Sequence, residues 1–301
     1  MGSHLAESLV NKKNKLLLIS KSNAKKANID TIQSKIIHKK ANITNFPKIG
    51  KIIDDFKPDM IIHLAGQTSH SQSFEQPLAD VDSNAKSTLF LLEKIRKTNP
   101  KCKFILGSTF IVIGRPKKLP VDENTPCNPT TIYGTNRLAS ENYCKIYHEV
   151  YGLDIKVFRI TNSYGPREQT IKNKNAVNFL IYKAHKNEEI TIFHKGKFFR
   201  DLIFISDVIS GIRFIIEKGK PGNLYWISSG QKTWFDKFGN ILHELTNSPV
   251  KYVATPTYTK KVDVGNFVVD NSKLRSLGWR PKTSLRKGVQ MTLDYLGKLN
   301  R

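Results

Sequence analysis

The chain has 301 residues, of which 39% are hydrophobic and 10% aromatic, so it can form a buried core and is not a disordered protein. It contains no apolar run near the ~18 residues of a membrane span and no secretory signal, so we expect neither a membrane protein nor a secreted one. Its three cysteines, Cys102, Cys127 and Cys144, are too few for a disulfide framework and lack metal-ligand spacing. We therefore expect a cytoplasmic protein without a metal site.

Lysine and arginine together number 49, against 25 aspartates and glutamates, which gives a formal net charge of +24. Such an excess is typical of proteins that bind nucleic acids, anionic membranes or phosphorylated ligands. The basic residues are mostly lysines scattered along the chain, however, and no helix-turn-helix, zinc or aromatic-platform motif accompanies them. We interpret the charge as a solvated surface and regard a nucleic-acid-binding module as the weaker alternative.

Short apolar segments alternate with amphipathic ones along much of the chain. The segments that we expect to be strands are Leu16–Ser20, Lys35–His38, Asp59–Ala65, Lys103–Thr109, Asp154–Thr161, Ile190–Phe193 and Asn223–Ser228. The expected helices are Phe46–Phe56, Leu78–Thr98, Ile132–Val150 and Val177–Lys186. This alternation predicts an α/β fold, a Rossmann-like doubly wound parallel sheet whose strands are buried on both faces.

The alternation becomes irregular after about Gly165, where elements are shorter and prolines and glycines more frequent. We expect one larger domain, formed by residues 1–165 with about 201–228, and a smaller lobe formed by residues 166–200 and 229–301. In doubly wound sheets the ligand lies outside the carboxyl ends of the strands. The polar residues that follow the expected strands are therefore candidate ligand contacts.

Tyr133 and Arg137 stand four residues apart on an expected helix, so they lie on one face with Cβ atoms roughly 5–6 Å apart. A phenol has an ordinary pKa near ~10, but a fixed cation beside it favours the phenolate, which is a proton acceptor. The hydroxyl of Thr109, at the end of the preceding strand, could share the proton with a substrate. An ordinary surface pair on the helix is the alternative interpretation.

Several short motifs occur in a fixed order along nearly the whole chain. They are His63-Leu64-Ala65-Gly66-Gln67, Asp82-Ser83-Asn84, Thr109 with Gly114 five residues later, Tyr133-Gly134, the run Arg159–Arg167, Arg200-Asp201, Asp207-Val208, Asp263-Val264, Asp270–Lys273 and Leu277–Pro281. In this order the chain resembles the extended short-chain dehydrogenase/reductase family, the NAD-dependent sugar-nucleotide epimerases and dehydratases of the UDP-glucose 4-epimerase type.

The resemblance implies a larger domain that binds NAD or NADP and a smaller lobe that binds a nucleoside-diphosphate sugar. The implied cofactor-binding residues are Gly2, Ser20, Lys21, Asn42, Ile43, Leu64, Ala65, Gly66, Asn84, Tyr133 and Arg137. The implied catalytic residues are Thr109, Tyr133 and Arg137, and the implied substrate-binding residues are Thr109, Asn162, Asn175, Arg200 and Asp263. A surface ion pair with Asp201 is the alternative for Arg200. The resemblance also implies a homodimer.

The chain departs from the family pattern at three places. Gly2 corresponds to the last glycine of a loop that cradles a pyrophosphate, so we expect the first strand and two glycines to be missing and a gap in the middle of the sheet. Arg137 replaces the family's lysine and keeps its charge, but it does not release a proton near neutral pH. Ser20-Lys21 replaces an aspartate at the end of a strand, which leaves the choice between NAD and NADP open.

The residues after Thr109 separate the possible reactions. Dehydratases of this family carry an Asp-Glu acid/base pair there, whereas this chain has Phe110-Ile111, which transfer no protons. The resemblance therefore implies a 4-epimerase that acts through a transient 4-keto sugar. The alternatives are a 4-keto-sugar reductase or dehydratase, and a catalytically silent protein that only binds a dinucleotide or a partner.

Overall fold

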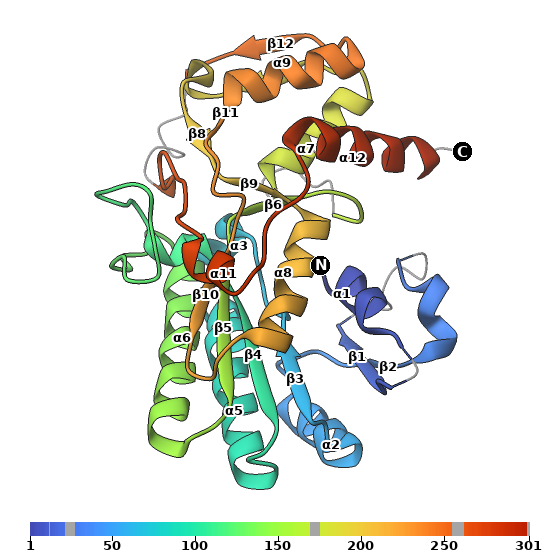
Figure 1. The fold of residues 1–301 in the computed structure, drawn as a ribbon, viewed down its shortest axis with the longest axis vertical. Coiled ribbons are helices and arrows are strands. Elements are labelled where there is room, and N and C mark those ends of the chain that lie inside the picture. The colour runs from blue at the N-terminus through green and yellow to red at the C-terminus, as the bar shows by residue number, and fades with distance from the viewer. Residues whose placement is uncertain (12, 22–27, 169–174, 255–261, 300–301) are drawn as a thin grey trace.

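The computed structural model describes residues 1–11, 13–21, 28–168, 175–254 and 262–299 (Figure 1). The strands are β1 (Leu16–Ser20), β2 (Ile36–Lys40), β3 (Met60–His63), β4 (Lys103–Thr109), β5 (Ile155–Ile160), β6 (Asn162–Tyr164), β7 (Ile190–Ile192), β8 (Phe199–Arg200), β9 (Leu202–Phe204), β10 (Leu224–Ile227), β11 (Thr233–Trp234) and β12 (Val250–Tyr252). The α-helices are α1 (Gly2–Leu9), α2 (Phe46–Phe56), α3 (His70–Glu75), α4 (Pro77–Val81), α5 (Ser87–Thr98), α6 (Ile132–Tyr151), α7 (Ala176–His185), α8 (Ile205–Lys218), α9 (Phe235–Thr246), α11 (Ser272–Ser276) and α12 (Leu285–Leu299). Shorter helical segments are η2 (Asp30–Lys35), η3 (Asp82–Lys86), η4 (Phe110–Ile113) and η5 (His194–Gly196).

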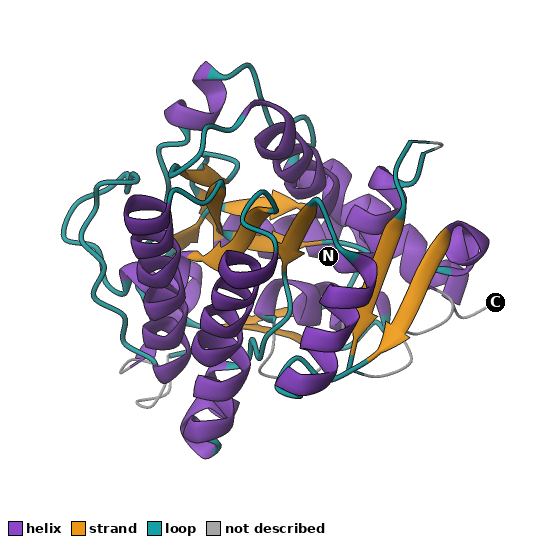
Figure 2. Cartoon of the chain, turned by 90° about the horizontal axis from the view of Figure 1, so that it is seen from below, coloured by secondary structure: helices purple, strands orange, loops and turns teal. Residues whose placement is uncertain are grey.

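A four-stranded parallel sheet in the order β10-β5-β4-β3 has helices on both faces, as Figure 2 shows. Successive residues of β4 point to opposite faces. Phe104 and Leu106 pack in a core with α5 and α6, whereas Ile105 packs in a second core to which α8 contributes. Phe104–Leu106 of β4 and the whole of β5 are buried. The predicted doubly wound α/β fold is confirmed.

The strands β1 and β2 form a separate two-stranded parallel sheet beside β3 (Figure 1). Among the described residues, β3 pairs only with β4, and β1 pairs only with β2. The expected gap in the sheet therefore lies between β1 and β3. All five residues of β1 and three of the four residues of β3 are only partly buried. The expectation that these apolar strands are buried on both faces is wrong, because no described strand covers their inner edges.

The predicted helix Leu78–Thr98 is divided in the structure into α4, the π-helical turn η3 and α5. A π-helical turn carries one extra residue per turn and often marks a functional site. Helices α8, α9 and α12 are not among the expected elements, although each has an apolar face that packs in the core containing Ile105. Within the described residues, no helix combines the length and the apolar composition needed to cross a bilayer.

The remaining strands lie beyond the carboxyl ends of the four-stranded sheet, in the upper part of Figure 1. They form three small sheets, in which β6 pairs with β9, β8 with β11 and β7 with β12. Helices α7, α9 and α12 pack together there. Since β6 follows β5 after a single residue, the chain passes directly from the four-stranded sheet into this region.

Candidate active site

Tyr133 lies in the first turn of α6, where the Thr131 side chain caps the helix by accepting a backbone hydrogen bond at 3.0 Å. A hydrogen bond joins the Tyr133 side chain to that of Thr109, the last residue of β4. One turn along α6, the Arg137 guanidinium donates to the carbonyl oxygen of Gly107, which also belongs to β4. The structure thus brings together the three residues that were expected to be catalytic.

Tyr133 and Arg137 are 7% and 4% exposed, so both groups lie in a low-dielectric environment. Burial raises the pKa of the Tyr133 phenol above its ordinary value, while the Arg137 charge and the Thr109 hydrogen bond act to lower it. The Arg137 charge lowers the pKa of the Tyr133 phenol, as expected, but burial raises that pKa by more.

A buried polar network that was not expected lies beside Tyr133. The Asp80 carboxylate accepts hydrogen bonds from the Nδ2 groups of Asn136 at 2.7 Å and Asn84 at 3.2 Å. All three residues are at most 8% exposed, and Asn84 lies within η3. The only signal in the sequence is spacing. Asp80 stands four residues before Asn84, and Asn136 stands three residues after Tyr133. The network fixes the π-helical turn against α6.

Two histidines also lie near the catalytic residues. The His70 ring stacks on the Tyr133 ring with 5.7 Å between centroids and an interplanar angle of 21°. Burial lowers the pKa of His70, with the charges of Asp263 and Asp80 acting in the opposite direction. Burial, with a smaller contribution from Arg137, lowers the pKa of His63 to about 3. Both imidazoles are therefore neutral at physiological pH.

A cavity of about 1,070 Å³ lies between β1 and β3 and continues past their carboxyl ends. Most of the residues that were expected to bind the cofactor line it, namely Gly2, Ser20, Lys21, Asn42, Ile43, Leu64, Ala65 and Gly66. Asn84, Tyr133 and Arg137 lie outside the lining. Pockets for cofactors usually measure about 300–1,000 Å³, so the cavity has room for a dinucleotide.

The rim of this cavity has two features that suit a bound nucleotide. Gly66 has φ +155°, and a Cβ atom there would collide with Oδ1 of Asn84. That Oδ1 atom is buried and has no hydrogen-bond partner among the described residues. A ligand donor near Gly66 would satisfy it. At the end of β1, Ser20 Oγ is 2.8 Å from Nε2 of His38, and Lys21 is exposed, so the described residues that end this strand present a hydroxyl and an ammonium group.

The expected substrate residues Asn162 and Asn175 lie close together. Asn175 caps α7 by accepting a hydrogen bond from the backbone of Asn178, and its Nδ2 donates to the carbonyl of Ser163 at 3.0 Å. Asn162 begins β6, next to Ser163, and its Oδ1 is buried without a partner among the described residues. The amide of Asn175 is therefore already used by the fold, while Asn162 retains an unsatisfied acceptor.

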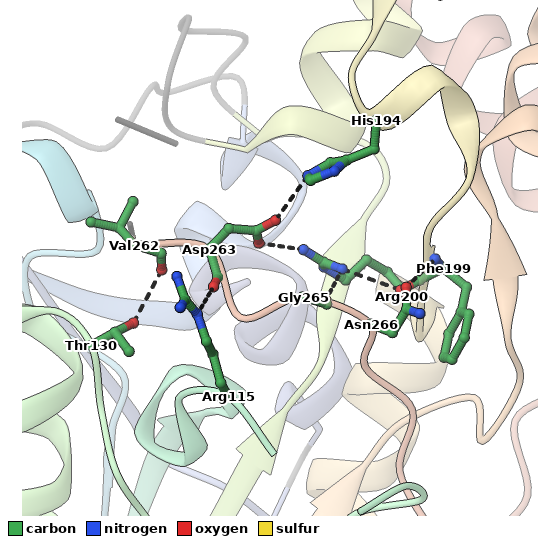
Figure 3. A network of polar contacts seen from close by, with 9 residues as sticks. All are labelled: Arg115, Thr130, His194, Phe199, Arg200, Val262, Asp263, Gly265 and Asn266. Carbon is green, nitrogen blue, oxygen red and sulfur yellow. Dashed lines mark hydrogen bonds and ion pairs between the residues drawn. The ribbon is translucent and has the colours of Figure 1, made fainter. Parts of the chain in front are cut away.

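Arg200 and Asp263, also expected to bind substrate, form an ion pair with each other (Figure 3). Asp263 contacts Nε2 of His194 at 3.5 Å, and Nε of Arg115 donates to its backbone carbonyl at 2.9 Å. Arg200 is 7% exposed, and burial lowers its pKa against the effect of Asp263. The alternative ion pair with Asp201 is not formed, because that carboxylate instead accepts hydrogen bonds from Ser229, Gly230 and Val269.

Comparison with known proteins identifies the family. The chain matches the family described as GDP-mannose 4,6 dehydratase over residues 1–292. The dTDP-D-glucose 4,6-dehydratase of Homo sapiens is 26% identical over 306 residues, which cover 98% of this chain and 86% of that protein.

Two solved structures share the fold over nearly the full length. The UDP-glucose 4-epimerase of Thermotoga maritima with UDP-glucose has a TM-score of 0.91 and 28% identity, covering 100% of this chain and 96% of that one. The UDP-glucuronic acid 4-epimerase of Bacillus cereus, in complex with UDP-glucuronic acid and NAD, has a TM-score of 0.86 and 25% identity, covering 99% and 96%. The chain therefore belongs to the NAD-dependent nucleotide-sugar epimerase and dehydratase family of the short-chain dehydrogenases, as its motifs indicated.

Proposed function

We propose that the protein is an NAD-dependent epimerase that inverts carbon 4 of a nucleoside-diphosphate sugar through a transient 4-keto sugar. The observation that carries this proposal is the hydrogen-bonded pair of Thr109 and Tyr133 at the carboxyl end of β4, with Arg137 one turn further along α6. A cavity large enough for a dinucleotide lies beside it. The relatives that bind UDP-sugars and NAD support the same substrate and cofactor classes.

In this reaction Tyr133 removes the proton from the 4-hydroxyl of the sugar and later returns it. Thr109 hydrogen-bonds the same hydroxyl and holds it at the phenol oxygen. The Arg137 charge stabilises the phenolate that burial alone disfavours. NAD, when bound, supplies the acceptor and later the donor of the hydride. Because one proton and one hydride leave and return, a single acid/base residue suffices.

The cofactor would be held by the residues that line the cavity and by three residues beside it. The lining supplies Gly2, Ser20, Lys21, Asn42, Ile43, Leu64, Ala65 and Gly66. Asn84 would use its unsatisfied Oδ1 at the rim, and Tyr133 and Arg137 would contact the reactive end. Lys21 follows β1 where a carboxylate would select NAD, so NADP is also accommodated.

For the substrate, we propose that Arg200 binds the diphosphate, since a guanidinium fork suits phosphate oxygens. Its ion pair with Asp263 holds the guanidinium in place before the ligand arrives. Asn162 would accept a hydrogen bond through its otherwise unsatisfied Oδ1, with Asn175 fixing the turn beside it. Asn175, Arg200 and Asp263 belong to the region that we propose as the substrate lobe, formed by residues 166–200 and 229–301, and Asn162 stands just before it in the chain.

The residues that follow Thr109 argue against dehydration. Phe110 and Ile111 form the start of η4 and are 9% and 4% exposed, so apolar packing occupies the positions of an acid/base pair. A dinucleotide-binding protein without turnover is the second candidate, because β1 and β3, which border the cofactor cavity, are not paired with each other among the described residues.

Incubation with UDP-glucose, UDP-galactose, UDP-glucuronic acid and dTDP-glucose in the presence of NAD tests the proposal. We expect at least one sugar nucleotide to be converted to an isomer of equal mass with an inverted 4-hydroxyl, detected by chromatography and proton NMR. Loss of one water would indicate a dehydratase instead. Cofactor binding without turnover of any of the four would indicate the silent binding protein.

We further propose a cytoplasmic homodimer. Ile146 and Val150 stand four residues apart on α6 and are 49% and 66% exposed, so they form an apolar stripe that faces solvent. Helix α6 packs beside α5, and a second copy could cover both helices. Light scattering would show twice the monomer mass, and replacement of Val150 by Lys would reduce it to the monomer mass.

A further inference from the structure

His194 lies beside the ion pair that we propose for diphosphate binding, and it was not among the expected site residues. Its Nε2 is 3.5 Å from Oδ2 of Asp263, and Oδ1 of the same carboxylate accepts from Arg200 (Figure 3). The short helix η5, which carries His194, lies between β7 and β8 in the chain, and β8 ends with Arg200. The imidazole and the guanidinium therefore share one carboxylate.

The three side chains of this network differ in how far they are open to solvent. The side chain of His194 is 36% exposed, that of Asp263 is 20% exposed and that of Arg200 is 9% exposed. His194 is thus the outermost of the three and the one most accessible to a ligand.

The ring of Phe198 supports both basic groups. The centroids of the His194 and Phe198 rings are 5.3 Å apart, and the guanidinium carbon of Arg200 lies 5.1 Å from the Phe198 centroid. Phe198 in turn stacks on Phe235 of α9 with 4.1 Å between centroids. Because an aromatic ring attracts a nearby cation, these surroundings suit a charged imidazolium as well as a neutral imidazole.

The backbone around His194 has an uncommon conformation. His194 has φ 53° and Lys195 has φ 52°. Residues other than glycine seldom adopt positive φ, and those that do gather at ligand sites. The turn is held by hydrogen bonds from Lys195 N to the Val253 carbonyl at 3.1 Å and from Gly196 N to the Phe193 carbonyl at 3.0 Å. The fold therefore fixes the position of His194 before a ligand arrives.

The formal charges of the network leave room for one more cation. Among its described residues, Arg200 and Arg115 are positive and Asp263 is negative. These groups leave a single net positive charge, whereas a diphosphate esterified at both ends carries a negative charge on each phosphate. A protonated His194 would make the opposite charges equal.

We propose that His194 is a further contact of the substrate's diphosphate and takes up a proton when the diphosphate binds beside Arg200. Histidine is the side chain whose charge ordinarily changes near neutral pH, and a neighbouring negative charge favours its protonated form. The charged N–H then donates to a phosphate oxygen, which is a strong hydrogen bond. The inference rests on the proposed function, because it takes Arg200 as the diphosphate site. Since the complex holds one more proton than the free protein, affinity falls as pH rises.

Other titratable groups lie around this network. His70 of α3 is near Asp263, whose charge acts to raise the pKa of His70 while burial lowers it. The remaining charged or titratable side chains around η5 are Asp236 of α9 and Tyr252 of β12, which lie beside Gly196, and Lys195 and Lys197, next to it in the chain. Among these types only histidine ordinarily titrates near neutral pH, so the test has to separate His194 from His70.

The first experiment is isothermal titration calorimetry on the full chain, with NAD present throughout. The probes are the methyl esters of UDP and dTDP, which keep a diphosphate esterified at both ends but lack a sugar and cannot be turned over. Titration in two buffers of different ionisation enthalpy gives the number of protons taken up. We expect proton uptake near neutral pH and a Kd about tenfold or more larger at about pH 8 than at about pH 5.5.

The second experiment uses substitutions that separate charge from structure. His194→Asn removes the titrating group, and asparagine adopts positive φ more readily than most residues. This variant should take up no proton and should bind at both pH values as weakly as the unmodified protein does at about pH 8. His194→Lys keeps a positive charge and should bind more tightly than His194→Asn at both pH values. His243→Gln is the matched control, since it replaces a histidine of α9 whose Nδ1 donates to the Ser248 carbonyl, and it should keep the proton uptake.

Several outcomes would overturn the proposal. Binding of the esters by the unmodified protein without proton uptake would do so, and this measurement depends on no variant that folds. Uptake that persists in His194→Asn would assign the proton to His70. Equal affinities of His194→Lys and His194→Asn would show that the charge at this position does not act on the diphosphate. Absence of binding by both esters at every pH would contradict the proposed function as well, whereas epimerisation of a sugar nucleotide without proton uptake on ester binding would refute this inference alone.

Discussion

The strands on the two sides of the cavity differ in how fully they are paired and buried. On the side of β4 and β5, strands are paired on both edges, and the side chains of Tyr133 and Arg137 are tied to Thr109 and Gly107 of β4. On the side of β1 and β2, the strands are half-buried and border a large cavity. The residues proposed for proton transfer are thus positioned by strands paired on both edges, whereas most of those proposed for cofactor binding line the cavity between β1 and β3.

Because of this difference, we expect substitutions in the two regions to have effects of different size. Variants of residues in or against β4 and β5 should strongly alter turnover or the free energy of unfolding. Variants of the β1 and β3 side chains that line the cavity should cost less stability, because the groups they remove have few partners to lose.

The largest effect is expected for Tyr133→Phe, which removes only the hydroxyl. Since that hydroxyl carries the proton transfer, turnover should fall by about 10²–10⁴-fold. Tyr147→Phe is the matched control, because it removes a hydroxyl from the same helix that bonds Glu93 at 2.8 Å, away from Thr109. Steady-state kinetics on the epimerised substrate measure both. Turnover of the Tyr133 variant within about threefold of the unmodified protein would show that another group moves the proton.

The next effect compares Ile105→Ala with Ile62→Ala, two residues that pair in register on β4 and β3. Ile105 is fully buried, so its truncation leaves a cavity and should lower the free energy of unfolding by about 2–5 kcal/mol. Ile62 lines the cavity between β1 and β3, and its truncation should cost roughly half as much, because part of its surface is already exposed. Urea unfolding measures both values. Equal costs would indicate that Ile62 is as fully buried in solution as Ile105.

Much of the fold follows from the sequence because its physical signals are local. The apolar runs of β1 and β4 and the amphipathic helix α2 lie where patterning places them. The partial exposure of β1 could not be predicted from the sequence, because the burial of a strand depends on neighbouring elements that no local pattern specifies. Residues Leu16–Ile19 have the composition of a buried strand and yet line a cavity.

The candidate site likewise contains some contacts that the sequence predicts and others that it does not. The spacing of Tyr133 and Arg137 on one helix was sufficient to place them together. The Asp80 network and the stacked His70 ring depend on contacts between residues more than 50 positions apart in the chain, which spacing does not encode. The pairing of Arg200 with Asp263 instead of Asp201 has the same cause, because Asp263 stands 63 positions further along the chain, where spacing does not point to it.

A smaller effect concerns the pH dependence of stability. Burial raises the pKa of Asp201 to about 6, although hydrogen bonds from Ser229, Gly230 and Val269 act to lower it. The folded chain therefore binds this proton more tightly than the unfolded chain, whose carboxyl has a pKa near ~3.9, so stability falls as pH rises through this interval. Between about pH 4.5 and pH 7 this group should cost about 2 kcal/mol.

The control for this prediction is Asp201→Asn, which cannot titrate. The variant should be less stable at both pH values, since it loses an acceptor for backbone donors, but the difference from the unmodified protein should shrink toward neutral pH. Urea unfolding at the two pH values measures the difference. A constant difference would mean that Asp201 is ionised throughout.

The smallest effect is expected at Arg137, where the chain replaces the family's lysine. Burial raises the pKa of Tyr133 and Arg137 lowers it, so Arg137→Met should raise that pKa further and shift the rise of activity toward alkaline pH. A shift of about one pH unit would lower activity about tenfold at neutral pH. Arg137→Lys keeps the positive charge and should leave the pH profile within a few tenths of a unit of the original. Because Arg137 also donates to Gly107 in β4, a purely structural role predicts a different pattern: both variants would lose stability and neither would move the pH profile. Turnover from pH 6 to pH 10, measured together with urea unfolding, therefore distinguishes a charge that acts on the phenol from a hydrogen bond that only holds α6 against the sheet.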